Sequence, residues 1–306
     1  MFSKTFINTL QKKNPIQGNM LITNMIRITI LTALLTIPFS KGQNQSINVI
    51  KKETIITKKF DIYLLIGQSN MGGRAKPEGL DKDTLKNVYI FTEDTLHPWE
   101  PAAVPLNKYS TIRQDLKREK LGPGYHFARV ISEVHNNRAI GLVENSRGGS
   151  SMNEWMPGTH YYKEAVRRTH NALKYGNLKA ILWHQGESDV SKYEQYLPKI
   201  ICMIDSLRIE FKNPDLPFIA GELAEVVIPR ANFNKELRKL PSLLKGTAVA
   251  SSEALTTIDS THYDTRSQRI FGERYAIELF KLWHNYPSKK LNNKLKYASN
   301  SNRDVK

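Results

Sequence analysis

The sequence has almost no cysteine, and this shortage excludes two kinds of stabilising chemistry. Cys202 is the single cysteine among 306 residues, so no disulfide can form within the chain and no cysteine cluster can bind a metal. The residue falls inside an apolar helical pattern, which predicts a buried and inert thiol. A helical His-x-x-x-His pair is also missing, so the sequence predicts no metal site.

Acidic residues are scarce relative to basic ones, 29 against 45, which gives a formal charge of +16. Such a charge raises the question of nucleic-acid binding. However, residues 1–42 and the segment Ser288–Lys306 each carry a net charge of +5, which leaves only +6 on the body of the chain. The body has no compact basic cluster interleaved with aromatic residues, as a nucleic-acid surface requires. We therefore expect no nucleic-acid partner.

No apolar run near the start is long enough to span a bilayer. The segment Ile26–Phe39 has fourteen residues, against the ~20 that a transmembrane helix needs. Basic residues precede it, and Ser40 and Gly42 occupy the −3 and −1 positions of a cut after Gly42, which is the layout of a signal peptide. We expect a secreted or periplasmic protein without stable membrane insertion after processing; an uncleaved anchor is the alternative.

Composition divides the chain into four segments. Residues 1–42 form the expected signal peptide, for which Met20 or Met25 would be a better-proportioned start. Residues 43–59 are a polar lead-in, and residues 60–284 form one folded domain. Residues 285–306 are basic and rich in Asn, Lys and Ser, a composition that predicts a disordered tail.

Short apolar runs alternate with amphipathic stretches along the folded domain. Most of these runs are continuous, as in strands buried on both faces of a parallel sheet. We predict helices through Phe127–Val134 and Leu197–Leu207, and a last helix capped by Asp264. This alternation predicts an α/β protein, a three-layer α/β/α sandwich with a mainly parallel sheet of five or six strands. The candidate strands are Ile62–Ile66, Val88–Phe91, Ile140–Val143, Ala180–Trp183, Phe218–Ala220 and Ala248–Ala250.

In such a sheet, ligands bind outside the carboxyl ends of the strands, so the segments that follow strands are the candidate site. Ser69 follows the first strand on a glycine-flanked turn. A serine there exposes its hydroxyl as a nucleophile should, and its own N–H can bind an oxyanion. The alternative is that Ser69 and Asn70 only cap the following helix.

The segment 145–151 follows the third strand and contains Gly148 and Gly149. Paired glycines let the backbone approach a ligand closely, although a flexible loop is the simpler interpretation. Trp155 nearby could stack on a sugar ring, but tryptophan packs more commonly in a core.

The segments after the fourth and last strands are rich in polar side chains. The amide of Gln185 can donate to an oxyanion, and the carboxylate of Glu187 can orient an imidazole. His184 is interpreted as a structural, hydrogen-bonded histidine and not as a second base. After the last strand, Asp259 and His262 offer an orienting carboxylate and a base on one short loop.

The segments 67–70, 145–151, 184–189 and 259–262 together resemble those of the SGNH-hydrolase superfamily. More narrowly, they are similar to the sialate O-acetylesterase and acetyl-xylan-esterase-like branch of carbohydrate esterases. The pairing of Gly-Gln-Ser-Asn with His-Gln-Gly-Glu carries this resemblance, which covers roughly Asp61 to Trp283. It implies a flavodoxin-like sandwich, an acetylated carbohydrate as substrate, and no cofactor.

The resemblance also implies a role for each residue of the site. Ser69 would be the nucleophile and His262 its base, with either Asp259 or Glu187 as the orienting acid. The oxyanion would be held by the N–H of Ser69, a backbone N–H of Gly148 or Gly149, and the Gln185 amide. The candidate substrate-binding residues are Gln68, Asn70, Arg147 and Trp155.

Two other functions remain open from the sequence. One is a non-catalytic carbohydrate-binding protein on the same fold, which would not need both Ser69 and His262 intact. The other is an esterase or lipase for another acyl ester, although no long apolar lid segment is present. The sequence does not decide between sialic acid, xylan and other glycans, nor the oligomeric state. The basic body slightly favours acidic sugars.

Overall fold

The computed structural model describes residues 59–135 and 137–283. The predicted signal peptide, nearly all of the lead-in and the predicted tail lie outside these residues. Within the described part of the chain, no helix is both long and apolar enough to cross a membrane.

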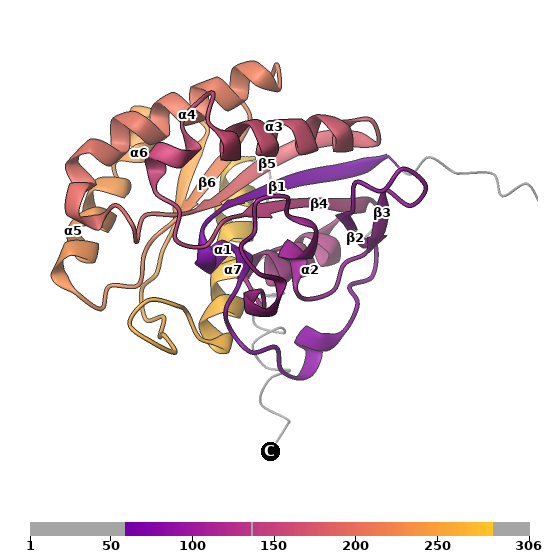
Figure 1. The fold of residues 1–306 in the computed structure, drawn as a ribbon, viewed down its shortest axis with the longest axis horizontal. Helices are drawn as coiled ribbons and strands as arrows, with labels where there is room; N and C mark the ends of the chain where they lie inside the picture. Colours follow the sequence, from indigo (N-terminus) through magenta and orange to yellow (C-terminus); the bar gives the residue numbers. More distant parts are fainter. Residues whose placement is uncertain (1–58, 136, 284–306) are drawn as a thin grey trace, which may run out of the picture. The chain divides into compact units, whose positions relative to one another are not determined.

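A seven-stranded sheet forms the centre of the fold, with strand order β3-β2-β4-β1-β5-β6-β7 (Figure 1). Every neighbouring pair is parallel except β2 and β3. The predicted α/β sandwich with a mainly parallel sheet is therefore confirmed. The strands are β1 (Phe60–Gly67), β2 (Val88–Phe91), β3 (Trp99–Pro101), β4 (Ala139–Ser146), β5 (Gly176–His184), β6 (Phe218–Gly221) and β7 (Thr247–Ala250).

The sheet has one strand more than the sequence predicted, and that strand is β3. It has three residues and lies antiparallel at the edge of the sheet. No apolar run marks it, because its three residues are Trp, Glu and Pro. It ends in Pro101, which cannot donate to a ladder and is tolerated at sheet edges. Trp99 attaches this edge to the core by stacking on Phe60, with the ring centroids 4.4 Å apart.

The helices follow the predicted alternation, and the three predicted ones correspond to α2, α4 and α7. The Asp264 side chain caps α7 by accepting a hydrogen bond from Ser267 N at 2.7 Å, as the sequence predicted. The α-helices are α1 (Ser69–Gly72), α2 (Pro123–Val134), α3 (His160–Leu173), α4 (Tyr196–Glu210), α5 (Ile228–Leu237), α6 (Leu240–Leu243) and α7 (Thr265–Leu282). Short 3-10 turns are η1 (Gly79–Lys82), η2 (Leu106–Tyr109), η3 (Leu116–Arg118), η4 (Met152–Trp155) and η5 (Val190–Gln195).

One sequence prediction about α4 is wrong, because Cys202 is exposed. The buried stripe of this helix includes Ile200 and Ile204. Cys202 lies midway between them along the chain and therefore points to the other side of the helix.

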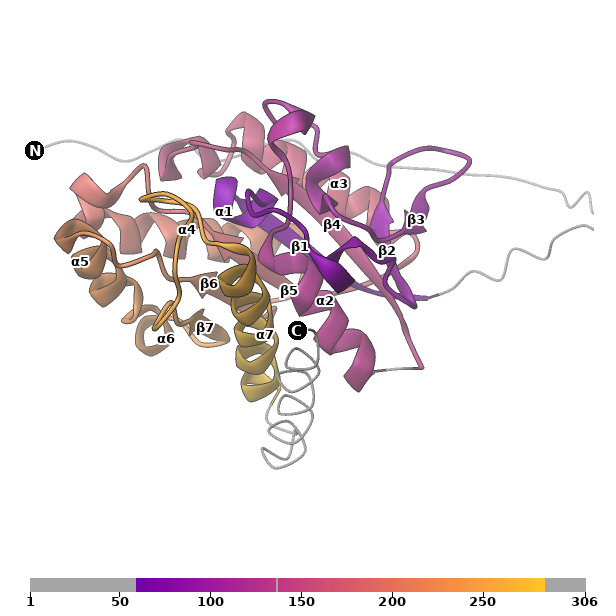
Figure 2. The same ribbon diagram turned by 90° about the horizontal axis from the view of Figure 1, so that it is seen from below.

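Helices cover both faces of the sheet, with α2 and α7 side by side on one face and α3 and α4 on the other (Figures 1 and 2). The central strand β1 shows why the sequence folds in this way. Tyr63 and Leu65 pack into the cluster that contains α2 and α7, whereas Ile62, Leu64 and Ile66 pack into the cluster that contains α3 and α4. Because side chains alternate along a strand and both sets are apolar, β1 is buried on both faces.

The carboxyl ends of the central strands lie at one level. Gly67 at the end of β1 pairs in register with Ser146 on β4 and with His184 on β5. The segments that follow these three strands therefore begin side by side, at the edge where α/β sheets bind ligands. Both β4 and β5 run farther than the sequence predicted.

Candidate active site

Ser69 lies at the sharp turn between β1 and α1. The chain passes Gln68 in an extended conformation and enters α1 at Ser69, and Gly72 N closes the turn on Gln68 O at 3.0 Å. The first N–H groups of a helix have no intrahelical acceptor. Accordingly, the Ser69 N–H has no hydrogen-bond partner within the described chain. The turn thus presents a hydroxyl and a free backbone donor together.

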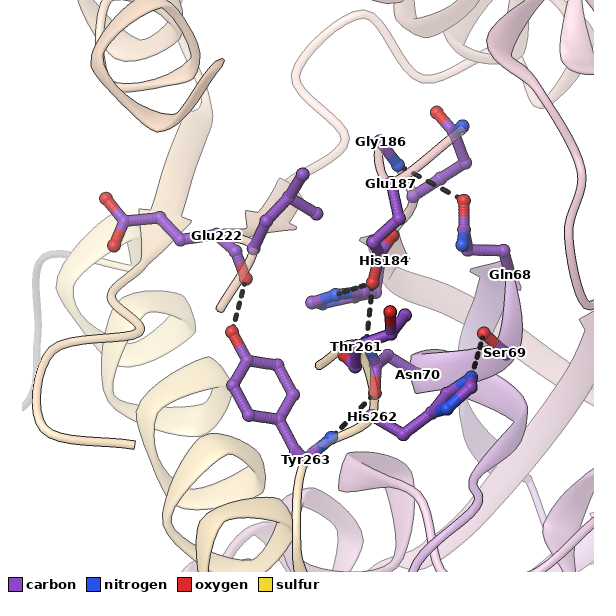
Figure 3. Close-up of polar contacts among 12 residues, drawn as sticks. Gln68, Ser69, Asn70, His184, Gly186, Glu187, Glu222, Thr261, His262 and Tyr263 are labelled. Atoms are coloured by element: carbon purple, nitrogen blue, oxygen red, sulfur yellow. Dashed lines mark hydrogen bonds and ion pairs between the residues drawn. The ribbon is translucent and has the colours of Figure 1, made fainter. Parts of the chain in front are cut away.

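Ser69, His262 and Asp259 form a continuous chain of hydrogen bonds. The Nε2 atom of His262 lies 2.9 Å from Ser69 Oγ, and its Nδ1 atom lies 2.8 Å from Asp259 Oδ2. Figure 3 shows the contact between His262 and Ser69. Asp259 Oδ1 also accepts from the backbone N–H groups of Thr261 and His262, both at 2.7 Å. This arrangement leaves Nε2 of a neutral imidazole free to accept the serine proton.

Asp259 is held ionised by the loop that carries it. Partial burial alone would raise its pKa, but hydrogen bonds from the His262 ring and from the backbone of His262 and Thr261 lower the pKa of Asp259 to about 2. A carboxylate that stays charged at neutral pH can stabilise the imidazolium that forms during proton transfer.

Glu187, the other candidate acid, does not contact His262. Its Oε1 atom accepts a hydrogen bond from Asn70 Nδ2 at 2.5 Å and lies 3.5 Å from His184 Nε2. Burial alone would raise the pKa of Glu187, but the contacts with His184 and Asn70 lower it. Of the two acids left open by the sequence, the structure brings Asp259 to the imidazole.

His184 has the structural role that the sequence predicted for it. The side chain is fully buried and makes edge-to-face contacts with the rings of Tyr263 and Phe271. Its Nδ1 atom lies 3.4 Å from the hydroxyl of Tyr275. No contact joins it to Ser69.

Gly148 and Gly149 line the same pocket as Ser69. A Cβ atom on Gly148 would lie 2.7 Å from Arg74 Nη2, so a side chain there would require the Arg74 guanidinium to shift. Gly149 has a φ of 74°, in the left-handed region that favours glycine. Within the described residues the Gly148 N–H has no hydrogen-bond acceptor.

The predicted oxyanion role of Gln185 is wrong, because its amide is fully occupied. The side chain is completely buried, and its Nε2 atom donates to Ser150 O at 3.0 Å and to Asp189 Oδ2 at 2.5 Å. Its Oε1 atom accepts from the Tyr196 hydroxyl at 3.0 Å. Both amide hydrogens are therefore used, one to join the loop after β5 to the loop after β4 and the other within the loop after β5.

Two of the predicted substrate-binding residues lie outside the pocket. Trp155 is fully buried, and its Nε1 donates to Ser150 Oγ at 2.8 Å, so neither ring face is open for a sugar. Arg147 donates to Ile112 O at 3.0 Å and lies over the ring of Tyr161. The burial of Trp155 contradicts its predicted role, and the contacts of Arg147 place it outside the residues that line the pocket.

The other two predicted substrate-binding residues differ in position. Gln68 lines the pocket, and its Oε1 atom accepts from Gly186 N at 3.4 Å (Figure 3). Asn70 is only 1% exposed, and its side-chain amide is hydrogen-bonded to Glu187 and to the backbone of Thr261 and Tyr263. The expectation that it binds substrate is therefore wrong.

The pocket has a volume of about 410 Å³, and sequence reasoning missed its arginines. Arg74, Arg118 and Arg230 line it, whereas Glu187 is the single carboxylate among its described lining residues. Arg74 pairs with Glu119 at 3.0 Å, and Arg230 donates to the loop that carries His262. Arg118 is exposed. These arginines come from three distant segments, so no local pattern could have grouped them.

Comparisons with known proteins identify the family to which the chain belongs. The family model described as "Carbohydrate esterase, sialic acid-specific acetylesterase" matches residues 59–281. A curated protein of Arabidopsis thaliana, named a probable carbohydrate esterase, is 33% identical over 185 residues, which cover 53% of this chain and 68% of the relative.

The X-ray structure of an Arabidopsis thaliana protein matches with a TM-score of 0.66 and 27% identity, over 73% of this chain and 99% of that one. The structure of a carbohydrate acetylesterase from Xanthomonas citri matches with a TM-score of 0.56 and 20% identity, over 74% and 57% of the two chains. This second match shows a shared fold.

Proposed function

Because the chain belongs to the carbohydrate esterase family described as sialic acid-specific acetylesterases, we propose that it removes O-acetyl groups from sugars with Ser69 as its nucleophile. Family membership makes the protein an esterase that hydrolyses ester bonds. The observation that supports a serine mechanism is the chain of hydrogen bonds from Ser69 through His262 to Asp259, at 2.9 and 2.8 Å.

In the first half of the proposed reaction, His262 Nε2 removes the proton from Ser69 Oγ while Oγ attacks the acetyl carbonyl carbon. The carbonyl oxygen becomes an oxyanion that faces the unpaired N–H groups of Ser69 and Gly148. Asp259 keeps the proton of the neutral ring on Nδ1 and stabilises the imidazolium that results.

The second half returns the enzyme to its starting state. His262 gives its proton to the sugar oxygen as the ester bond breaks, and the deacetylated sugar leaves an acetyl group on Ser69. The imidazole then removes a proton from water, which attacks the acetyl-enzyme. Acetate leaves as the proton returns to Ser69 Oγ.

We propose Gln68 as the third oxyanion donor in place of Gln185. Gly186 N donates to Gln68 Oε1, which fixes the amide so that Nε2 is turned away from Gly186. That nitrogen has no partner within the described chain, and the residue lines the pocket. A preorganised amide donor of this kind stabilises charge only as it develops in the transition state.

We further propose that the preferred sugar is anionic, as sialic acid is, and not neutral like xylan. Three arginines line the pocket, and the carboxylate of Glu187 is already bonded to Asn70. Of the three arginines, Arg118 has the guanidinium that is most available to bind substrate, since its side-chain hydrogen bond within the described chain is a long one of 3.5 Å to Gln114. Guanidinium groups bind carboxylates by charge-assisted hydrogen bonds.

Replacing Arg118 by glutamine is expected to raise KM for acetylated sialic acid by about 10-fold, because one hydrogen bond to a charged group is lost. The change should leave KM for acetylated xylo-oligosaccharide unaltered. Steady-state acetate release on both substrates measures the difference, with Lys117→Gln as the control, since Lys117 is an exposed neighbour outside the pocket. Equal effects on both sugars, or a wild-type preference for xylan, would contradict the anionic substrate.

We also propose that residues 1–42 direct export and are removed near Gly42. The mature chain would then act outside the cytoplasm, where acetylated glycans of the surroundings are its substrates. Mass spectrometry of the exported protein is expected to find an N-terminus at Gln43. A retained segment 1–42 would contradict cleavage.

A further inference from the structure

Asn70, next to the nucleophile, forms hydrogen bonds with the backbone on both sides of His262. Its Nδ2 atom donates to Thr261 O at 3.0 Å, and its Oδ1 atom accepts from Tyr263 N at 3.1 Å. Thr261 and Tyr263 are the two chain neighbours of His262, and Figure 3 shows the amide between them. One side chain therefore ties the turn that carries Ser69 to the loop that carries His262.

The loop with the base needs such an attachment. It covers residues 251–264, between β7 and α7, and Ile258, Asp259 and Ser260 at its tip are exposed. Tyr263 and Leu255 anchor the rest of the loop in the apolar core, whereas the exposed tip has few buried apolar contacts, so the geometry of the tip depends on the hydrogen bonds that hold it. Arg230 holds the loop from one side, through Ser260 O at 2.5 Å, and Asn70 holds it from the other.

Glu187 helps to set the orientation of the Asn70 amide. The two hydrogens on Nδ2 point to Glu187 Oε1 and to Thr261 O, and both of these atoms are acceptors. A flipped amide would place Oδ1 against them and its hydrogens against the N–H of Tyr263. The backbone groups of Thr261 and Tyr263 already favour the observed orientation, and Glu187 adds to this preference because an ionised carboxylate only accepts hydrogen bonds.

The position of Glu187 is in turn supported by its contact with His184. Its side chain is 5% exposed and lies 3.5 Å from the buried ring of His184. That ring packs edge-to-face against Tyr263, the residue that follows the base. Asn70 is therefore the hydrogen-bonded connection from Glu187 to the loop, and His184 supports Glu187.

We propose that Glu187 and Asn70 form one positioning unit that sets His262 against Ser69. Neither residue contacts the reacting atoms in this role, and Glu187 acts through Asn70. The inference rests on the proposed serine mechanism and deepens it, because it gives a function to the carboxylate that the imidazole does not use.

The proposed unit should affect turnover and not substrate binding. Displacing a catalytic group by about 1 Å can lower the rate by on the order of 10²-fold. The arginines of the pocket do not contact Asn70, so the ground-state complex should be little changed. A role in stability alone would change the melting temperature and leave kcat of the folded enzyme unaltered.

A double-mutant cycle tests whether the two residues act as one unit. Asn70→Ala and Glu187→Ala are each expected to lower kcat by about 30- to 100-fold with KM within about twofold of wild type. The kcat of the double variant should lie within about threefold of the kcat of the less active single variant, because the second substitution removes no further positioning contact. Losses that multiply would overturn the inference, since they would indicate independent roles.

A conservative variant separates the hydrogen bond from a general effect of charge. The carbonyl of glutamine can accept the same bond from Asn70, so Glu187→Gln should retain kcat within about fivefold of wild type. A loss as large as that of Glu187→Ala would contradict positioning through Asn70. Glu222→Gln is the matched control, because this buried carboxylate binds Ser252 N at 2.8 Å at the far end of the same loop. We expect it to lower the melting temperature and to keep kcat.

The outcomes for this inference and for the proposed function are distinguishable. Wild-type enzyme that neither releases acetate nor reacts at Ser69 with a fluorophosphonate contradicts the serine mechanism itself. Active wild-type enzyme, together with folded Asn70→Ala and Glu187→Ala variants of unchanged kcat, contradicts only the positioning unit. Circular dichroism at the assay temperature establishes that each variant is folded.

Discussion

Acetate release is expected to fall by at least about 10⁴-fold when Ser69 is replaced by alanine, because removal of a nucleophile leaves only binding and oxyanion stabilisation. The Ser69 hydroxyl is the group hydrogen-bonded to His262 Nε2 at 2.9 Å. Without it the imidazole has no proton to remove and the acetyl group has no acceptor. The fold should persist, since the Oγ atom contributes to the site and not to the apolar core.

The measurement is steady-state acetate release from an acetylated sugar, beside the thermal melting of both proteins. Ser260→Ala is a suitable control, because it removes an exposed serine hydroxyl from the loop that carries the base. The control should keep wild-type activity. A rate for Ser69→Ala above about one-hundredth of wild type would place the nucleophile elsewhere.

The second large effect is expected from Asp259→Asn, which should lower kcat by about 10³-fold with little change in KM. An asparagine can present an N–H group to Nδ1 of His262, which favours the tautomer that cannot accept the serine proton. The loss should be smaller than in a buried triad, because the Asp259 side chain is 52% exposed and water can partly replace it. Steady-state kinetics on one acetylated sugar measure it.

Glu187→Gln is the matched comparison, since it makes the same chemical change in the other candidate acid. Glu187 contacts Asn70 and His184 and not the base. Its conversion to glutamine should therefore cost less than Asp259→Asn by roughly two orders of magnitude, the difference between loss of the orienting acid and a retained hydrogen bond. The reverse order would assign the orienting role to Glu187.

Most of the fold could be predicted because its strands are buried on both faces. Continuous apolar runs such as Ile62–Ile66 mark such strands directly, and their alternation with helical patterns determines the layers. The edge strand β3 carries no such signal, because three residues ending in Pro101 have no apolar run. The polar ends of β4 and β5 were missed because their pairing with Gly67 is a tertiary feature.

The site could be predicted in part, because its members follow successive strands and so meet at one edge of the sheet. Ser69, Asp259 and His262 were identified in this way. Local patterns could not reveal which amide is free, and Gln185 is occupied by Tyr196, Ser150 and Asp189 only in the folded chain. The choice between the two acids likewise depends on distances that no spacing encodes.

Covalent labelling shows whether ester hydrolysis proceeds through Ser69. A fluorophosphonate probe should form one adduct, on the peptide that contains Ser69, and acetate release should cease in proportion to labelling. The labelling rate should fall in Asp259→Asn, because the same imidazole activates Ser69 in both reactions. Labelling of another residue, or continued acetate release from protein fully modified at Ser69, would contradict the account.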